Sequence, residues 1–145
     1  MGNKIGLASD HAGYEVKEYI RKLLDKKDIS YVDYGAYSEE STSYATYGHR
    51  LAEAIEQNEV QKGIAVCGSG NGINMTLNKH QGIRAALCWC EEIAQLARKH
   101  NDANVLSLPG RYVSFDLAEK IVDIFLNTSF EGGRHQKRID AINKH

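Results

Sequence analysis

The chain of 145 residues has one proline, three cysteines and no long hydrophobic run. A single proline excludes a proline-rich linker. Cys67, Cys88 and Cys90 are odd in number and lack the usual zinc spacings, so we expect neither a disulfide framework nor a metal site. No apolar stretch approaches the roughly 20 residues that cross a bilayer, so no membrane segment is expected. Cysteine usage of this kind favours a reducing cytoplasm.

Net charge is also nearly absent. The chain has 18 basic and 19 acidic residues, which gives a formal charge of -1. This balance provides no bulk field that would attract nucleic acid or anionic lipid. An anionic ligand must therefore be held by a local cluster of basic groups.

Short apolar runs alternate with amphipathic stretches along the whole chain. Strands are predicted at residues 4–9, 29–34, 63–67, 84–88 and 104–108. Helices are predicted around residues 16–24, 47–55, 93–100, 117–125 and 134–143, with a short helix after residue 72, a polar loop over 36–45 and Ser114 as an N-cap. The pattern predicts one domain over residues 1–145, an α/β fold of the three-layer α/β/α Rossmann-like sandwich type with a five-stranded parallel sheet. Ligands of such folds bind at the carboxyl ends of the strands.

A glycine-rich segment, Gly68-Ser69-Gly70-Asn71-Gly72, follows the third predicted strand. Its amides can point inward at an anion. It lacks the third glycine of the dinucleotide fingerprint and the lysine of a P-loop, and a sharp turn that binds nothing is the alternative. Cys67 ends the strand, where nearby amides would favour a reactive thiolate, although most free cysteines are buried packing residues. We expect Cys88 and Cys90 to be packing residues.

Three further polar groups are candidates for the same site. Asp10-His11 follows the first strand and could handle protons or cap the first helix. Arg134 and Arg138 are four residues apart on a predicted helix, where they could hold a phosphate or form a solvated basic face. His100, beside Asn101, ends a helix and could merely complement the helix dipole.

These residues fall within motifs that resemble one known family. The motifs are Ala8-Ser9-Asp10-His11-Ala12-Gly13, Cys67 to Gly72, Asn78-Lys79, Gly82-Ile83-Arg84-Ala85, His100 to Leu106 and Glu131-Gly132-Gly133-Arg134-His135. In this order, over essentially the whole chain, they resemble type B ribose-5-phosphate isomerase, whose family also contains galactose-6-phosphate isomerase subunits.

The resemblance implies interconversion of D-ribose 5-phosphate and D-ribulose 5-phosphate in the pentose phosphate pathway, without metal or organic cofactor. It implies that Cys67 is the base that moves the proton between C2 and C1. Ser69 and the amides of Gly70, Asn71 and Gly72 would stabilise the enediolate. Asp10 would handle protons on the substrate oxygens, and His100 would open the furanose ring.

The resemblance also implies the remaining substrate contacts and a homodimer or homotetramer. His11, Arg134 and Arg138 would bind the phosphate. Arg111, His100 and Asn101 are similar to residues that reach a neighbouring subunit's site. Tyr44 and Gly68 complete the expected substrate contacts.

The sequence departs from the family pattern at two places. Ser43-Tyr44-Ala45 stands where Asp-Tyr-Pro is frequent, and Ser69 stands where threonine is common. Some relatives use a glutamate later in the loop instead of the cysteine; Asn74 offers no such carboxylate here. The alternatives to a pentose phosphate isomerase are a hexose 6-phosphate isomerase, for allose or galactose 6-phosphate, and a non-catalytic phosphosugar or nucleotide-binding module.

Overall fold

Five parallel strands form one sheet in the order β2-β1-β3-β5-β4, in a computed structural model that describes residues 3–144. The strands are β1 (Ile5–Ser9), β2 (Tyr31–Asp33), β3 (Lys62–Cys67), β4 (Ala85–Leu87) and β5 (Val105–Pro109). The helices are α1 (Tyr14–Lys26), α2 (Tyr44–Glu56), α3 (Asn71–Leu77), α4 (Glu91–Lys99), α5 (Phe115–Asn127) and α6 (Arg134–Ile142). The predicted α/β fold with a five-stranded parallel sheet is therefore confirmed.

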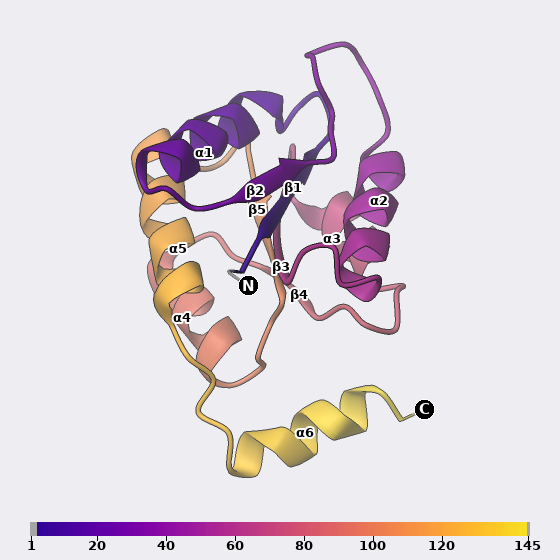
Figure 1. The fold of residues 1–145 in the computed structure, drawn as a ribbon, viewed down its shortest axis with the longest axis vertical. Coiled ribbons are helices and arrows are strands. Elements are labelled where there is room, and N and C mark those ends of the chain that lie inside the picture. The colour runs from indigo at the N-terminus through magenta and orange to yellow at the C-terminus, as the bar shows by residue number, and fades with distance from the viewer. Residues whose placement is uncertain (1–2, 145) are drawn as a thin grey trace.

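Helices cover both faces of the sheet, as expected for parallel strands that bury both faces. Side chains alternate along each strand, so that Ile64 and Val66 of β3 pack with α1, α4 and α5, whereas Ala65 and Cys67 pack with α2 and α3. Figure 1 shows the two helical layers on opposite sides of the strands. The Cys67 side chain therefore leaves the sheet on the α2 and α3 side.

Helix α2 begins earlier than the sequence predicted. Residues 36–45 were expected to form a polar loop, but the helix begins at Tyr44 because the Ser43 hydroxyl accepts a hydrogen bond from the Ala45 amide at 3.1 Å. The Ser114 hydroxyl accepts one from the Leu117 amide at 3.0 Å, which confirms the predicted N-cap of α5. Ser43 thus supplies the cap even though the acidic residue frequent in the family is missing.

Parallel strands place all their carboxyl ends at one edge of the sheet and all their amino ends at the other. Helix α6 lies at the amino edge, beyond the end of α4, and extends away from the other helices (Figure 1). Only two of its residues, His135 and Ile139, are buried. Within residues 3–144, no helix combines the length and the apolar character that spanning a bilayer would require.

Candidate active site

A pocket of about 440 Å³ opens at the carboxyl edge of the sheet, above β1, β3 and β5. Most of the residues that the sequence predicted for the site line it. The lining residues are Asp10, His11, Ala12, Thr42, Ser43, Tyr44, Cys67, Gly68, Ser69, Gly72 and Arg111. The sequence did not predict Ala12, Thr42 or Ser43, although Thr42 and Ser43 stand beside the Tyr44 that it did single out.

Cys67 is the last residue of β3, and its side chain is almost enclosed, at 3% exposure. On one side it packs with the apolar cluster that includes Ala8 and Ile73. On the other side it faces the pocket, together with Ser69 and Gly72. The thiol is therefore shielded from bulk water yet open to a bound ligand, which is the placement that a catalytic base requires.

The glycine-rich segment turns sharply from β3 into α3. Gly70 is the N-cap of α3 and has a φ of 80°, a left-handed conformation that favours glycine, and a Cβ there would overlap Leu87. A Cβ on Gly72 would overlap the ring of Tyr44, so glycine at this position allows the aromatic ring to lie directly on the loop. Two glycines thus fix both the path of the loop and the position of Tyr44.

The expected amide cradle is narrower than the resemblance implied. The Asn71 amide donates to the hydroxyl of Ser69 at 3.2 Å, and neither Gly70 nor Asn71 lines the pocket. Gly72 does line it, and the amides of a helix's first turn have no partner within the helix. The Gly72 amide and the exposed Ser69 hydroxyl are therefore the donors best placed for a negatively charged oxygen.

Asp10 and His11 hold the wall of the pocket that follows β1. The buried Asp10 carboxylate accepts from the Gly13 amide at 3.0 Å, in the turn before α1, and also lines the pocket; the N-cap of α1 is Gly13 rather than Asp10. The Thr42 amide donates to Nδ1 of His11 at 3.1 Å. Nδ1 also lies 3.3 Å from the Thr42 carbonyl, so residue 42 holds that side of the ring and Nε2 is left for a ligand.

Arg111 reaches this pocket within its own chain. The resemblance placed it in a neighbouring subunit's site, but β5 lies beside β3 and Arg111 lines the Cys67 pocket of its own chain. The Arg111 amide donates to the Gly68 carbonyl at 3.0 Å, and its guanidinium lies against Gly68. This guanidinium gives the pocket a local positive charge.

The other predicted site residues lie at the opposite edge of the sheet. His100 is the C-cap of α4, Asn101 follows it, and Arg134 and Arg138 lie exposed on α6. Neither arginine lines the Cys67 pocket among residues 3–144, although the resemblance placed both on the substrate phosphate. His100 and Asn101 precede β5 in the chain, so they lie at the amino end of that strand, whereas Cys67 lies at the carboxyl end of β3. This order along the chain could have predicted that His100 and Asn101 lie far from Cys67.

The turn that carries His100 and Asn101 is firmly held. Arg84 donates to the Asn101 carbonyl at 3.0 Å and to the Asp102 carbonyl at 2.9 Å. The buried Arg98 donates to the Asp102 carboxylate at 2.8 Å and to the Ala103 carbonyl at 2.7 Å. These two arginines, which sequence reasoning gave no role, fix the second group of site residues.

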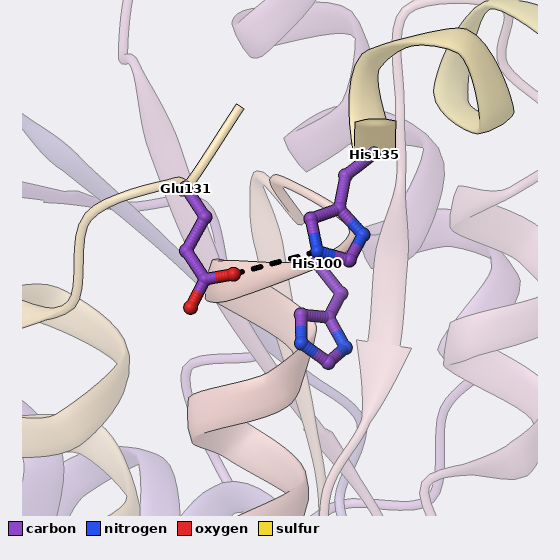
Figure 2. Close-up of side chains that lie close together, drawn as sticks. All are labelled: His100, Glu131 and His135. Atoms are coloured by element: carbon purple, nitrogen blue, oxygen red, sulfur yellow. Dashed lines mark ion pairs between the residues drawn. The ribbon is translucent and has the colours of Figure 1, made fainter. Parts of the chain in front are cut away.

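His100 also lies beside two further ionisable side chains, and Figure 2 shows all three. Its ring stacks on that of His135 with centroids 4.3 Å apart, and Nε2 of His135 lies 3.4 Å from the Glu131 carboxylate. Burial, the nearby Arg134 and His100 lower the pKa of His135. The sequence predicted no metal site, but these three residues are of metal-ligating type and lie together.

A larger cleft of about 520 Å³ lies at the amino edge, between the end of α6, Asn101 and residues 78–86. It contains no part of the glycine-rich loop and not Cys67. The smaller pocket is the better candidate for the reaction because it unites a thiol, a carboxylate, free amides and positive charge.

The other two cysteines differ from Cys67 in their surroundings. Cys88 is fully buried, and burial raises the pKa of its thiol to about 12. Cys90 is half-buried at the N-cap of α4. Neither lines the pocket, in agreement with the expectation that they are packing residues.

Comparison with known proteins gives consistent matches over nearly the whole chain. A family model described as Ribose/Galactose Isomerase matches residues 5–142. Ribose-5-phosphate isomerase B of Escherichia coli is 43% identical over 139 residues, which cover 96% of this chain and 93% of the relative.

Solved structures agree with the fold in detail. A ribose 5-phosphate isomerase from Thermotoga maritima superposes with a TM-score of 0.97 at 47% identity and covers 100% of both chains. Ribose-5-phosphate isomerase B from Mycoplasma genitalium, solved with bound ribulose-5-phosphate, gives a TM-score of 0.94 at 42% identity over 99% of this chain and 96% of that one. This chain belongs to the ribose/galactose isomerase family.

Proposed function

We propose that the chain interconverts D-ribose 5-phosphate and D-ribulose 5-phosphate through an enediolate, with Cys67 as the base. The observation that carries this proposal is the pocket in which the Cys67 thiol faces the same space as Ser69, Gly72, Asp10 and His11. The chain is an aldose–ketose isomerase by family, and its relatives from Escherichia coli and Mycoplasma genitalium, named for ribose 5-phosphate, support the pentose substrate. This activity would place it in the pentose phosphate pathway.

The chemistry follows from the positions of these groups. The Cys67 thiolate removes the proton from C2 of the open-chain aldose, and the electron pair forms the C1–C2 double bond of the enediolate while charge develops on O1. The Gly72 amide and Ser69 hydroxyl stabilise that charge in a pocket with little water. Asp10 moves the proton between O2 and O1, and the thiol returns its proton to C1 to give the ketose.

Binding energy from the phosphate holds the reacting carbons against the thiol. Arg111 and Nε2 of His11 provide cationic and hydrogen-bonding groups in the same chain. Arg134 and Arg138 lie at the opposite edge of the sheet, so they can contribute only to the pocket of another copy. We therefore propose a homodimer, or a homotetramer of such dimers, in which His100, Asn101, Arg134 and Arg138 of one copy complete the Cys67 pocket of the next.

The location is also a proposal. The described residues contain three free cysteines, one of them in the candidate active site. A reducing cytoplasm would keep that thiol available.

The test is an assay of the purified protein, with EDTA present, against ribose 5-phosphate, allose 6-phosphate and galactose 6-phosphate. We expect turnover of ribose 5-phosphate and a loss of about 10² to 10⁴-fold in kcat in the Cys67→Ser variant, as for a lost general base. Cys90→Ser is the matched control, because serine is a good N-cap and Cys90 lies outside the pocket. Unchanged turnover in Cys67→Ser would remove the thiol from the mechanism, and preference for a hexose phosphate would correct the substrate.

A further inference from the structure

Three ligand-type side chains from separate segments meet at the amino edge of the sheet. His100 ends α4, Glu131 lies between α5 and α6, and His135 lies in the first turn of α6. One donor atom from each lies within 4.8 Å of the other two. Figure 2 shows the two rings and the carboxylate facing one another. We call these residues the His100–Glu131–His135 cluster.

Backbone contacts hold the cluster in place. The Glu131 amide donates to the Lys99 carbonyl at 3.0 Å, and Arg98 donates to the Thr128 carbonyl at 3.1 Å. The segment that carries Glu131 is therefore fixed against the end of α4. The cluster is thus part of the folded framework rather than a chance meeting of long surface side chains.

One atom of the cluster lacks the hydrogen bond that its burial demands. His135 is 3% exposed, and its Nε2 has no hydrogen-bond partner within the described part of the chain. This nitrogen faces the Glu131 carboxylate at 3.4 Å, which is an ionic contact rather than a good hydrogen bond. A buried polar atom without a partner is costly, so a ligand that used its lone pair would be stabilising.

We propose that the His100–Glu131–His135 cluster binds a divalent cation of the zinc class, with a fourth position left to water. Two imidazoles and one carboxylate are a donor set that suits Zn²⁺. Binding requires the donor atoms to approach one another, which the half-exposed Glu131 side chain can do by rotation and His100 by turning out of its stack.

The charges around the cluster make Glu131 decisive. The C-terminal end of α4 favours a cation at His100, whereas the N-terminal end of α6 and the neighbouring Arg134 oppose one. Glu131 supplies the only negative charge within the cluster. Its removal should therefore weaken cation binding more than a simple loss of one contact would suggest.

Cation binding would also affect the reaction, and this consequence rests on the proposed function. A cation on the His100 ring would occupy the lone pair needed to open the sugar ring. Zinc bound at the cluster would thus inhibit the isomerase without entering the Cys67 pocket of the same chain. Removal of the cation by a chelator would restore activity.

Direct binding is measured first, without reference to activity. The full-length protein, stripped of metal, is titrated with Zn²⁺ against a chromophoric chelator and with Co²⁺ by visible absorption. We expect one site per chain, a Co²⁺ spectrum without the charge-transfer band of a thiolate ligand, and affinity reduced about tenfold or more in Glu131→Gln. His135→Asn should also bind Zn²⁺ more weakly. His135 is buried, so this substitution could prevent folding, whereas Glu131 is half-exposed and Glu131→Gln should leave the fold intact.

Two control variants exclude other sites on the chain. His49 and His80 form a second pair of imidazoles, with Nδ1 of His49 2.7 Å from Nε2 of His80. His80→Gln tests whether Zn²⁺ binds at this pair. Cys67→Ser tests binding by the thiol. Both should bind Zn²⁺ as the unaltered protein does. Affinity unchanged in Glu131→Gln, or lost in His80→Gln or Cys67→Ser, would overturn the cluster as the site.

The catalytic consequence is measured on the same variants. Zn²⁺ should slow turnover of ribose 5-phosphate reversibly. Inhibition of each variant is expressed relative to its own rate without metal, and Glu131→Gln should need about tenfold more Zn²⁺ than the unaltered enzyme for the same fractional inhibition. Zinc bound at the cluster with turnover unchanged would overturn the inhibitory role. A protein that binds zinc there but isomerises none of the three sugar phosphates would contradict the proposed function and leave the metal site standing.

Discussion

Single residues of the glycine-rich loop are constrained in two separable ways. Gly70 adopts a positive φ, and it also lacks space for a Cβ beside Leu87. Gly132 adopts a similar φ of 72°, but among residues 3–144, its own atoms and those of its chain neighbours apart, no heavy atom lies within 4 Å of the position of its Cβ. The two glycines therefore allow conformational strain to be measured apart from steric overlap.

We predict that Gly132→Ala costs about 1–2 kcal/mol, the strain of a left-handed alanine. Gly70→Ala should cost clearly more, about 3 kcal/mol or above, because the added carbon also displaces Leu87. Denaturant unfolding of both variants gives the comparison. Equal losses of stability would show that the loop relaxes around the new side chain.

One side chain that is expected to hold the substrate phosphate is that of Arg138. Arg138 lies exposed on α6, one residue after Lys137, which has the same charge and is also exposed. A guanidinium can bind a phosphate through two hydrogen bonds, whereas a neighbouring charge on another face of the helix cannot reach the same oxygen atoms.

Arg138→Ala should therefore raise KM for ribose 5-phosphate by about tenfold or more and change kcat much less, as expected for the loss of uniform binding. Lys137→Ala should leave both constants close to those of the unaltered enzyme. Steady-state kinetics of the two variants measure this difference. An Arg138→Ala enzyme with an unchanged KM would exclude Arg138 from the phosphate site.

At the scale of elements, an ion pair inside the fold joins α1 to the end of β2. Lys17 is 1% exposed, and its ammonium contacts the Asp33 carboxylate at 2.7 Å and the Ala36 carbonyl at 2.6 Å. The same loop binds the end of β1, because the Ser9 amide donates to the Gly35 carbonyl at 2.7 Å. The pair thus fixes a loop at the edge of the sheet where the candidate active site lies.

Lys17→Met should destabilise the protein by about 3 kcal/mol, because it leaves the Asp33 carboxylate without its main partner. Lys22→Met is the matched control, since Lys22 lies exposed on the same helix. Thermal or denaturant unfolding checks the difference between the two. A Lys17→Met protein as stable as the control would mean that the pair serves only to position the loop.

Local patterns predicted most of the elements. Ile64, Val66 and the other buried strand residues form continuous apolar runs, and the alternation of strands with helices implied the parallel sheet. The start of α2 was missed because a single hydroxyl, that of Ser43, decides it within a polar stretch. The burial of Lys17 was not predicted, although Lys17 lies three residues before the buried Ile20, because lysine side chains are almost never fully buried unless they are paired.

At the scale of the whole molecule, the sequence predicted correctly that some of the candidate site residues meet, and did not predict that others lie at the opposite edge of the sheet. Cys67 ends β3, and Asp10 and His11 follow β1, so their meeting at one edge could be predicted from topology alone. The place of Arg134 and Arg138 depends on how α6 leaves the end of α5, and no local pattern encodes that path. In the proposed homodimer, one chain would therefore carry two incomplete halves of a site, at opposite edges of its sheet.

A site divided between copies can be tested by mixing two defective chains. Cys67→Ser damages one half of the site and His100→Asn the other, so a mixed dimer contains one site with both changes and one with neither. Random exchange of subunits should restore about a quarter of the wild-type rate, since half of the dimers are mixed and each has one intact site of two. Cys67→Ser mixed with Ser69→Ala is the control, because both changes lie in the same half and every site keeps one of them. If activity recovers in the first mixture and not in the control, the site is built from two copies. The same low activity in both mixtures would place all the catalytic groups within one chain.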